Sequence, residues 1–273
     1  MKTCPYCNAK IKGSPKFCTE CGARLPEDSG SSLNHESALL ATDAVFASGA
    51  QLRQARLAAA VSPDEIISSR AYNGVIAGIL LWGLLINVLL CTYAYRFVMQ
   101  ISPVLFMLLY LVCCFAGIRI AARSNNPGIS FLGYNMVVVP FGLMIAVFVQ
   151  DYGGIGAAVV RDAFVYTMLI TLGMTAVVII APSLFEKLGG ALFGCLLGLF
   201  LCEIVLLIFR VDQYVTDWLL AGLFSMYIGY DIHRAQQFPK TVDNAVDSAL
   251  DIYLDIANLF IRLLSILGRR DKK

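Results

Sequence analysis

The chain has 273 residues, of which 58% are hydrophobic and only 15% are charged, and its net charge is +2. Soluble domains carry about 25% charged residues. The mean hydropathy of the chain is +0.72, which means more apolar residues than the core of a water-soluble protein needs. Nine cysteines are too few for a disulfide scaffold in a chain of this length. The near-neutral charge gives no indication of a nucleic-acid partner. These features exclude an ordinary soluble domain and indicate an integral membrane protein with a polar N-terminal part.

Residues 1–28 are polar and contain two C-x2-C pairs separated by ten residues: Cys4, Cys7, Cys18 and Cys21. Two residues between thiolates allow one tight turn to direct both sulfurs at the same Zn²⁺ at about 2.3 Å, and the second turn completes a tetrahedron. The spacing predicts a small structural zinc ribbon, folded mainly by its metal. The alternative is two disulfides in an exported segment, but the start of the chain has no apolar run, so we expect no signal peptide.

Four thiolates around one zinc leave no open position for a substrate, so we expect no catalysis at the ribbon. Its basic residues are scattered among acidic ones, and no nucleic-acid binding is expected. The module is predicted to stabilise the chain or to bind a cytosolic protein partner.

Residues 29–70 are predicted to form a linker with an amphipathic helix, because apolar residues recur there at helical spacing within an Ala-rich stretch. Ser62, Pro63 and Glu65 have the pattern of a capped helix start. A tether lying against the membrane and an ordinary soluble helical linker both fit this composition.

Apolar segments of about 20 residues, the length that crosses roughly 30 Å of hydrocarbon, repeat from Tyr72 onward. No strand-like alternation is present, so residues 71–268 are predicted to be an all-α polytopic membrane bundle, followed by a basic tail at 269–273. The seven predicted transmembrane helices are 74–95, 103–122, 128–149, 163–181, 188–209, 216–231 and 246–268.

Basic residues flanking these segments predict a cytoplasmic N-terminus by the positive-inside rule. The residues on that side include Arg56, Arg70, Arg123, Lys187, Arg234 and Lys240, against Arg96, Arg161 and Arg210 on the other. The basic tail conflicts with this rule, because seven crossings place it outside; a last segment that enters and returns is the alternative. We expect seven crossings in a bacterial plasma membrane, with an internal eukaryotic membrane as the alternative location.

A charged residue at the centre of a membrane helix costs about 2.5–3.5 kcal/mol, so each one requires a partner or a function. Arg119 lies near the end of the second segment, where its side chain can reach the interface. Glu203 lies in the middle of the fifth segment. Glu203 is either a protonated acid that is hydrogen-bonded to a neighbouring helix or a residue with a functional role.

The seventh segment has one polar stripe. At 100° per residue, Asp251, Asp255, Asn258 and Arg262 fall within about 60° of one another. Such a stripe faces the bundle interior or water, and it is either a static ion-pair seam or a hydrophilic path. Asp231 ends the sixth segment, and an antiparallel hairpin would bring it near Asp251 or Asp255. Two carboxylates in a medium of low dielectric constant cannot both stay ionised, so they share a proton. Such a pair can also bind a hard divalent cation.

At these residues the chain resembles the Bax inhibitor-1 (transmembrane Bax inhibitor motif) family. The resemblance covers roughly residues 70–268 and is strongest in Gly229-Tyr230-Asp231-Ile232 and in the run from Ala249 to Phe260. It implies a seven-helix bundle with the last helix central, acting as a pH-sensitive calcium leak. Asp231 and Asp255 match the family's di-aspartyl sensor, and Arg119 or Arg123 matches an arginine that latches onto the first of them. The zinc ribbon lies outside the resemblance.

The sequence therefore predicts a calcium leak gated by a di-aspartyl pair, with Ca²⁺ as the transported ion. The alternative is a membrane-anchored adaptor whose ribbon recruits a cytosolic partner to a membrane complex. An intramembrane aspartyl protease also uses two aspartates, but the sequence has no Gly-x-Gly-Asp at either position. We therefore expect that the protein is not an enzyme.

Overall fold

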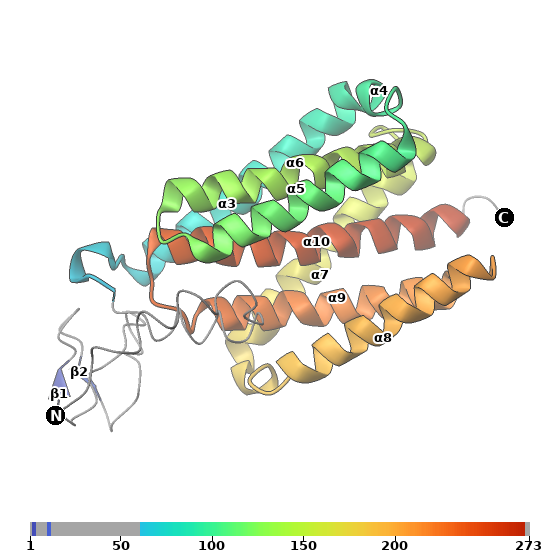
Figure 1. Cartoon of the computed structure of the whole chain (residues 1–273). Helices are drawn as coiled ribbons and strands as arrows, with labels where there is room; N and C mark the ends of the chain where they lie inside the picture. The colour runs from blue at the N-terminus through green and yellow to red at the C-terminus, as the bar shows by residue number, and fades with distance from the viewer. Residues whose placement is uncertain (1, 4–9, 12–60, 271–273) are drawn as a thin grey trace.

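The computed structural model describes residues 2–3, 10–11 and 61–270 (Figure 1). Two short strands, β1 (Lys2–Thr3) and β2 (Lys10–Ile11), pair antiparallel with Lys2 opposite Ile11. The four cysteines of the predicted ribbon and most of the predicted linker lie outside the described residues. The zinc ribbon and the linker helix therefore stay predictions.

The predicted helix start at Ser62 is wrong. Pro63–Glu65 form only one turn of 3-10 helix, η1, and the first long helix begins at Ser69. Its cap is Ser68, whose side chain accepts a hydrogen bond from the amide of Ala71. The turn cannot continue, because the amide of Ile67 donates to the carbonyl oxygen of Lys240 at 2.9 Å and ties the chain to the loop before the last helix.

Long helices make up almost all of the remaining described chain, as the sequence predicts. The first is α3 (Ser69–Leu89), which continues through a π-helical turn, η2 (Leu90–Ala94), into α4 (Tyr95–Val98). The others are α5 (Pro103–Arg123), α6 (Pro127–Asp151), α7 (Ala158–Ile180), α8 (Gly189–Ile208), α9 (Tyr214–Ala235) and α10 (Val242–Arg270), with a 3-10 turn, η3 (Pro182–Leu184), before α8.

The last two helices are longer than predicted. Apolarity alone placed them at 216–231 and 246–268, whereas α9 begins at Tyr214 and α10 spans Val242–Arg270. The additional first turn of α10 is polar, but its acid has a partner inside the bundle: Asp243 accepts from Ser130 of α6 at 2.6 Å. A helix can continue through charged residues when tertiary contacts satisfy them.

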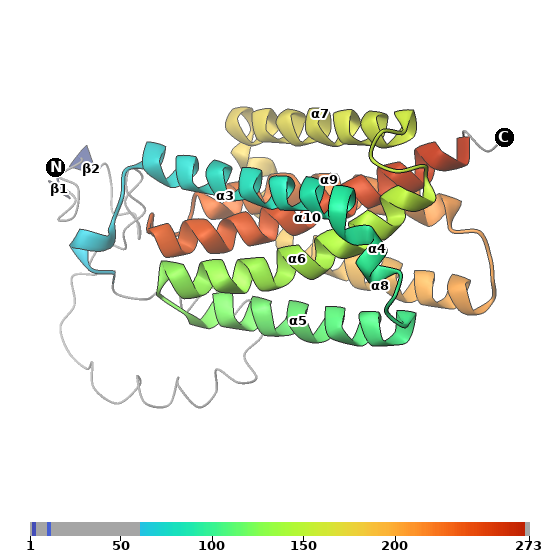
Figure 2. The ribbon, with the colours of Figure 1, turned by 90° about the horizontal axis from the view of Figure 1, so that it is seen from above.

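Helix α10 lies at the centre of the bundle, against α3, α6, α7 and α9 (Figures 1 and 2). It runs the length of the bundle, so its last residues lie at the end opposite to the start of α3 (Figure 1). With 29 residues it is about 44 Å long, more than the roughly 30 Å of a hydrocarbon core. Within the described residues the last segment is therefore one continuous helix that does not turn back, and it is long enough for a full crossing.

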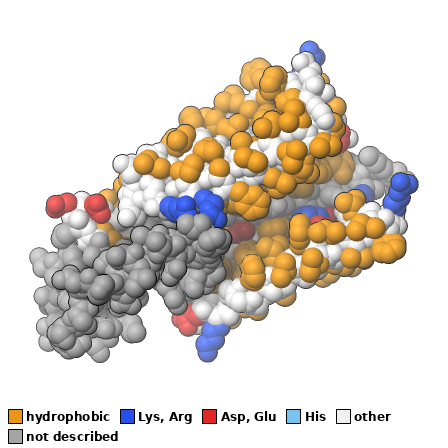
Figure 3. Space-filling view, viewed as in Figure 1, with side chains coloured by type: hydrophobic (Ala, Val, Ile, Leu, Met, Phe, Trp, Pro, Cys, Tyr) orange, Lys and Arg blue, Asp and Glu red, His pale blue; other side chains and the backbone are white. Residues whose placement is uncertain are grey.

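The outer helices carry the apolar surface. Within the described residues, five helices are long and apolar enough to cross a membrane: α3 with its extension, α5, α6, α7 and α8. Hydrophobic side chains cover much of their outward surface (Figure 3). Helices α9 and α10 do not meet that criterion, and α10 is largely enclosed by the others. An all-helical membrane bundle is thus confirmed, with its most polar helix inside.

Buried tyrosines fix α10 against its neighbours. The hydroxyl group of Tyr72 donates to the carbonyl oxygen of Ala235 and lies 3.1 Å from the Ser248 hydroxyl, joining α3, α9 and α10. The hydroxyl of Tyr253 donates to Asn87 of α3 at 3.0 Å. These bonds satisfy polar groups in the core and set the rotation of α10.

Helices α5 and α6 meet at two glycines. A Cβ atom at Gly117 would lie 2.6 Å from the carbonyl oxygen of Gly133, and one at Gly133 would lie 2.8 Å from the amide nitrogen of Ala121. Because backbone atoms cannot move aside, only glycine permits this close approach. The contact holds the start of α6, with Ser130, beside the start of α10.

Candidate functional site

One charged cluster joins the end of α9 to the first half of α10. The Arg234 guanidinium lies 2.8 Å from the Asp231 carboxylate on its own helix and also pairs with Asp251 of α10. It packs between the rings of Tyr230 and Phe238. Arg234 therefore bridges the two helices and neutralises the buried Asp231 and the partly exposed Asp251.

Asp255 completes this cluster from one turn further along α10. Asp231 and Asp255 are 8% and 7% exposed, and their carboxyl groups lie close enough to interact electrostatically. Among the described residues, Asp255 Oδ2 has no hydrogen-bond partner. Two carboxyl groups can share a hydrogen bond only when one of them is protonated. Asp231 and Asp255 are therefore a buried pair of acids that cannot both ionise without a large cost.

The acidic stripe of α10 extends beyond what the sequence singled out. Asp243 and Asp247 precede Asp251 and Asp255 at four-residue intervals and are buried. Residues four apart share one face of a helix, so these acids line the side of α10 that starts at the Asp243–Ser130 bond.

A second charged cluster lies near the other end of the bundle. Arg262 of α10 forms a two-point ion pair with Glu203 of α8, at 2.5 and 2.8 Å, and also contacts Asp217 of α9 at 2.9 Å. The Asp217 side chain is 3% exposed and also receives bonds from Arg269 and Ser265. Three helices are therefore held together by ion pairs, with Glu203 in the ion-paired form.

Apolar side chains separate the two clusters. From Asp255 to Arg262 the axis of α10 rises by about 10 Å, and Leu220, Phe224 and Leu259 of the common apolar core are buried along α9 and α10. Buried apolar side chains thus lie between the two clusters along α9 and α10.

Three residues singled out from the sequence do not enter either cluster. Arg119 and Arg123 are exposed on α5, and the arginine that pairs with Asp231 is Arg234. Asn258 donates to the carbonyl oxygen of Leu254 on its own helix at 2.8 Å. The polar stripe of α10 is thus divided between two separate sites.

The sequence reasoning missed Arg234, Asp217 and Arg269 as site residues. Arg234 follows Asp231 by three positions, a spacing at which side chains on a helix meet, and this signal could have identified it. Asp217 lies near the start of the sixth segment, where hydropathy alone places a charged residue at the membrane surface. Arg269 was assigned to the basic tail.

The clusters do not form a preformed metal site. Among residues 2–3, 10–11 and 61–270, no group of three or more His, Cys, Asp or Glu side chains is arranged to hold a metal ion. Asp231 and Asp251 are instead occupied by Arg234. A cation at either carboxylate would therefore compete with the arginine.

Membrane-length helices around a buried, charged central helix define a polytopic membrane protein with internal ion-pair clusters. Residues 67–272 match the family described as "Inhibitor of apoptosis-promoting Bax1". Since this match covers most of the chain, the protein belongs to that family, as its resemblance to Bax inhibitor-1 proteins indicated.

Curated relatives are similar over shorter stretches. Protein lifeguard 4 of Mus musculus is 34% identical over 116 residues, 42% of this chain and 48% of that protein. An uncharacterized protein of Helicobacter pylori is 33% identical over 108 residues, 36% of this chain and 46% of that protein. The Golgi anti-apoptotic protein of vaccinia virus is 31% identical over 117 residues, 42% of this chain and 49% of that protein. The chain spans about half the length of these relatives.

Proposed function

We propose that this protein is a pH-sensitive cation leak, with Ca²⁺ as the transported ion. The observation that carries the proposal is the burial of two interacting acids, Asp231 and Asp255, between the two most polar helices. Buried acids in a membrane bundle cost free energy, and they typically belong to ion or proton pathways.

Protonation sets the state of this contact. In the proposed closed state the two acids share one proton, and loss of that proton leaves two negative charges side by side in a medium of low dielectric constant. The charges then repel each other and attract a divalent cation, which prefers carboxylate oxygens. The leak is therefore expected to open as the pH rises and to close as the pH falls.

Arg234 is the internal competitor of the cation. It already neutralises Asp231 and Asp251, so a Ca²⁺ ion must displace the guanidinium from at least one of them. Because Arg234 already neutralises the carboxylates, the closed state is expected to be stable without a bound ion. Because Arg234 and Asp231 belong to α9 and Asp251 belongs to α10, conduction is expected to require movement of these two helices against each other.

The test is calcium flux into liposomes that contain the purified full chain and an enclosed calcium-sensitive dye. With equal pH on both sides, uptake above that of empty liposomes is expected to rise from about pH 5 to about pH 8. A flux equal to that of empty liposomes at every pH would refute the leak. A leak that opens on acidification would contradict the proposed role of the shared proton.

We also propose that Cys4, Cys7, Cys18 and Cys21 bind one structural Zn²⁺, on the strength of their spacing alone. The intact protein should contain zinc in a near-equal molar amount by elemental analysis. Cys18→Ser should lose most of it, while Cys195→Ser, which changes an exposed cysteine of α8, should retain it. Equal zinc in the two variants would contradict the proposal. Recruitment of a cytosolic partner by this module stays a prediction from the sequence.

We further propose that the end of the bundle that contains the start of α3 faces the cytoplasm of a bacterial cell. The loops and helix ends on that side carry Arg70, Arg123, Lys187, Arg234 and Lys240, against Arg96, Arg161 and Arg210 before the last helix on the other. The end of α10, with Arg269 and Arg270, opposes this bias, so the proposal gives more weight to the earlier helices. In this orientation the Asp231–Asp255 cluster lies nearer to the cytoplasm, and the Arg262 cluster lies nearer to the opposite surface.

A further inference from the structure

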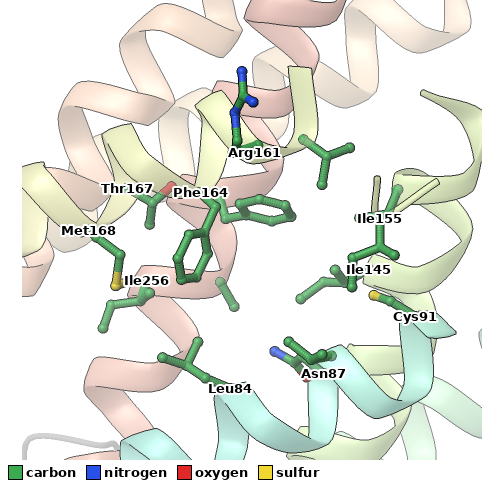
Figure 4. A pocket seen from close by; sticks show the side chains of 15 residues that line it. Leu84, Asn87, Cys91, Ile145, Ile155, Arg161, Phe164, Thr167, Met168 and Ile256 are labelled. Carbon is green, nitrogen blue, oxygen red and sulfur yellow. The ribbon is translucent and has the colours of Figure 1, made fainter. Parts of the chain in front are cut away.

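A groove opens sideways between α3 and α7 and reaches α10. Its volume is about 300 Å³, and its walls come from α3, α6, α7 and α10. Figure 4 shows Phe164, Met168 and Ile256 on one side of the space, with Leu84 and Ile145 among the side chains on the others. An apolar cavity of about 150 Å³ already binds a benzene molecule, so this groove can hold an extended apolar group.

The polar residues in the groove wall are used inside the protein. Asn87 accepts the hydrogen bond of Tyr253 through its side-chain oxygen. The Thr167 hydroxyl donates to the carbonyl oxygen of Ala163 at 2.7 Å. The surface left for an occupant is therefore almost entirely hydrocarbon, which excludes a hydrated ion or a sugar.

The position of the groove in the membrane restricts its occupant further. Both α3 and α7 are apolar enough to span the bilayer, so the opening between them faces lipid. In that position, the abundant apolar groups of suitable shape are the acyl chains of the bilayer.

One cation stands at the edge of the groove. Arg161, in the first turn of α7, belongs to the wall and points away from the apolar space (Figure 4). Its side chain is 72% exposed, and its nearest acid, Asp162, is also exposed at 3.4 Å. Such a surface pair is weak, so the guanidinium is available to a phosphate at the headgroup level.

We propose that this groove binds an anionic phospholipid, with one acyl chain between α3 and α7 and the phosphate on Arg161. The inference is independent of ion conduction. It rests on the apolar wall, the opening toward the bilayer and Arg161, the one basic residue among the described residues that line the groove.

Native mass spectrometry of the purified full chain tests this site. The probe is an equimolar mixture of phosphatidylglycerol and phosphatidylcholine with identical acyl chains, added to the detergent-solubilised protein. One phosphatidylglycerol molecule is expected to be retained, with about fivefold preference over phosphatidylcholine. Equal retention of the two lipids, or preferred retention of added oleate, would overturn the proposal.

Two pairs of variants locate the lipid. Arg161→Gln should remove the preference for phosphatidylglycerol, while Arg96→Gln, an exposed arginine at the same end of the bundle, should preserve it. Val88→Trp, which fills the groove from a 47% exposed position on α3, should reduce retention of both lipids several-fold. Leu85→Trp, 51% exposed but outside the groove wall, should not. Identical lipid retention by the two variants of either pair would refute the site. Calcium flux through the same variants is measured separately, so that a failure of the lipid site is distinguished from a failure of the leak.

Discussion

Replacement of Asp255 by asparagine is expected to make calcium flux low and independent of pH. The asparagine amide can donate to Asp231 without a titratable proton, so it preserves the contact between α9 and α10 at every pH. In the wild-type chain, loss of the shared proton would separate the pair. A tenfold change in the open population needs only about 1.4 kcal/mol, well within the repulsion of two buried carboxylates. The measurement is dye-reported uptake into liposomes across the same pH range.

The matched control for this variant is Asp162→Asn, which changes an exposed carboxylate of α7 in the same chemical way. It should keep the pH dependence of the wild-type chain. Persistence of that dependence in Asp255→Asn would show that the sensor lies elsewhere, and its loss in both variants would show that any change of surface charge suffices.

Replacement of Arg262 by methionine is expected to produce the largest loss of stability. The methionine would leave Glu203 without its ion-pair partner and remove one of two arginines from Asp217, whose side chain is 3% exposed. Breaking a buried pair in this way costs about 3–5 kcal/mol. For a chain of this size the midpoint of thermal unfolding should fall by about 10 °C.

Thermal unfolding in detergent, followed by intrinsic fluorescence, measures this effect. Arg96→Met removes an exposed arginine and should leave the midpoint almost unchanged. The double variant Glu203→Gln with Arg262→Met should unfold at a higher temperature than Arg262→Met alone, because it removes a carboxylate that has lost its ion-pair partner. A midpoint for Arg262→Met no lower than that of Arg96→Met would mean that the cluster contributes nothing to stability.

The positions of the helices could be predicted from the sequence because hydropathy reports directly on contact with lipid. The second predicted segment, 103–122, corresponds to α5 (Pro103–Arg123), and the fifth, 188–209, corresponds to α8 (Gly189–Ile208). Where a helix faces other helices, this signal weakens. For that reason the ends of α9 and α10 were placed too far inward.

The partners of the charged residues could not be predicted in the same way. Asp231, Asp255, Glu203 and Arg262 were all recognised as buried charges, but pairing depends on how helices rotate and slide against each other. Only the packing shows that Arg262 reaches Glu203 of α8, and that Arg234 takes the place beside Asp231. The resemblance to a known family pairs Asp231 with Asp255, and both are buried, whereas Arg119 and Arg123 lie exposed on α5.

The enclosure of α10 has a consequence for how the protein is made. During synthesis, α10 leaves the ribosome after α3 to α9, and its four regularly spaced acids oppose independent entry into lipid. Its partners on α9 and the apolar helices around it are already made when it emerges. Integration of α10 is therefore a folding event driven by contacts with helices that are already in the membrane.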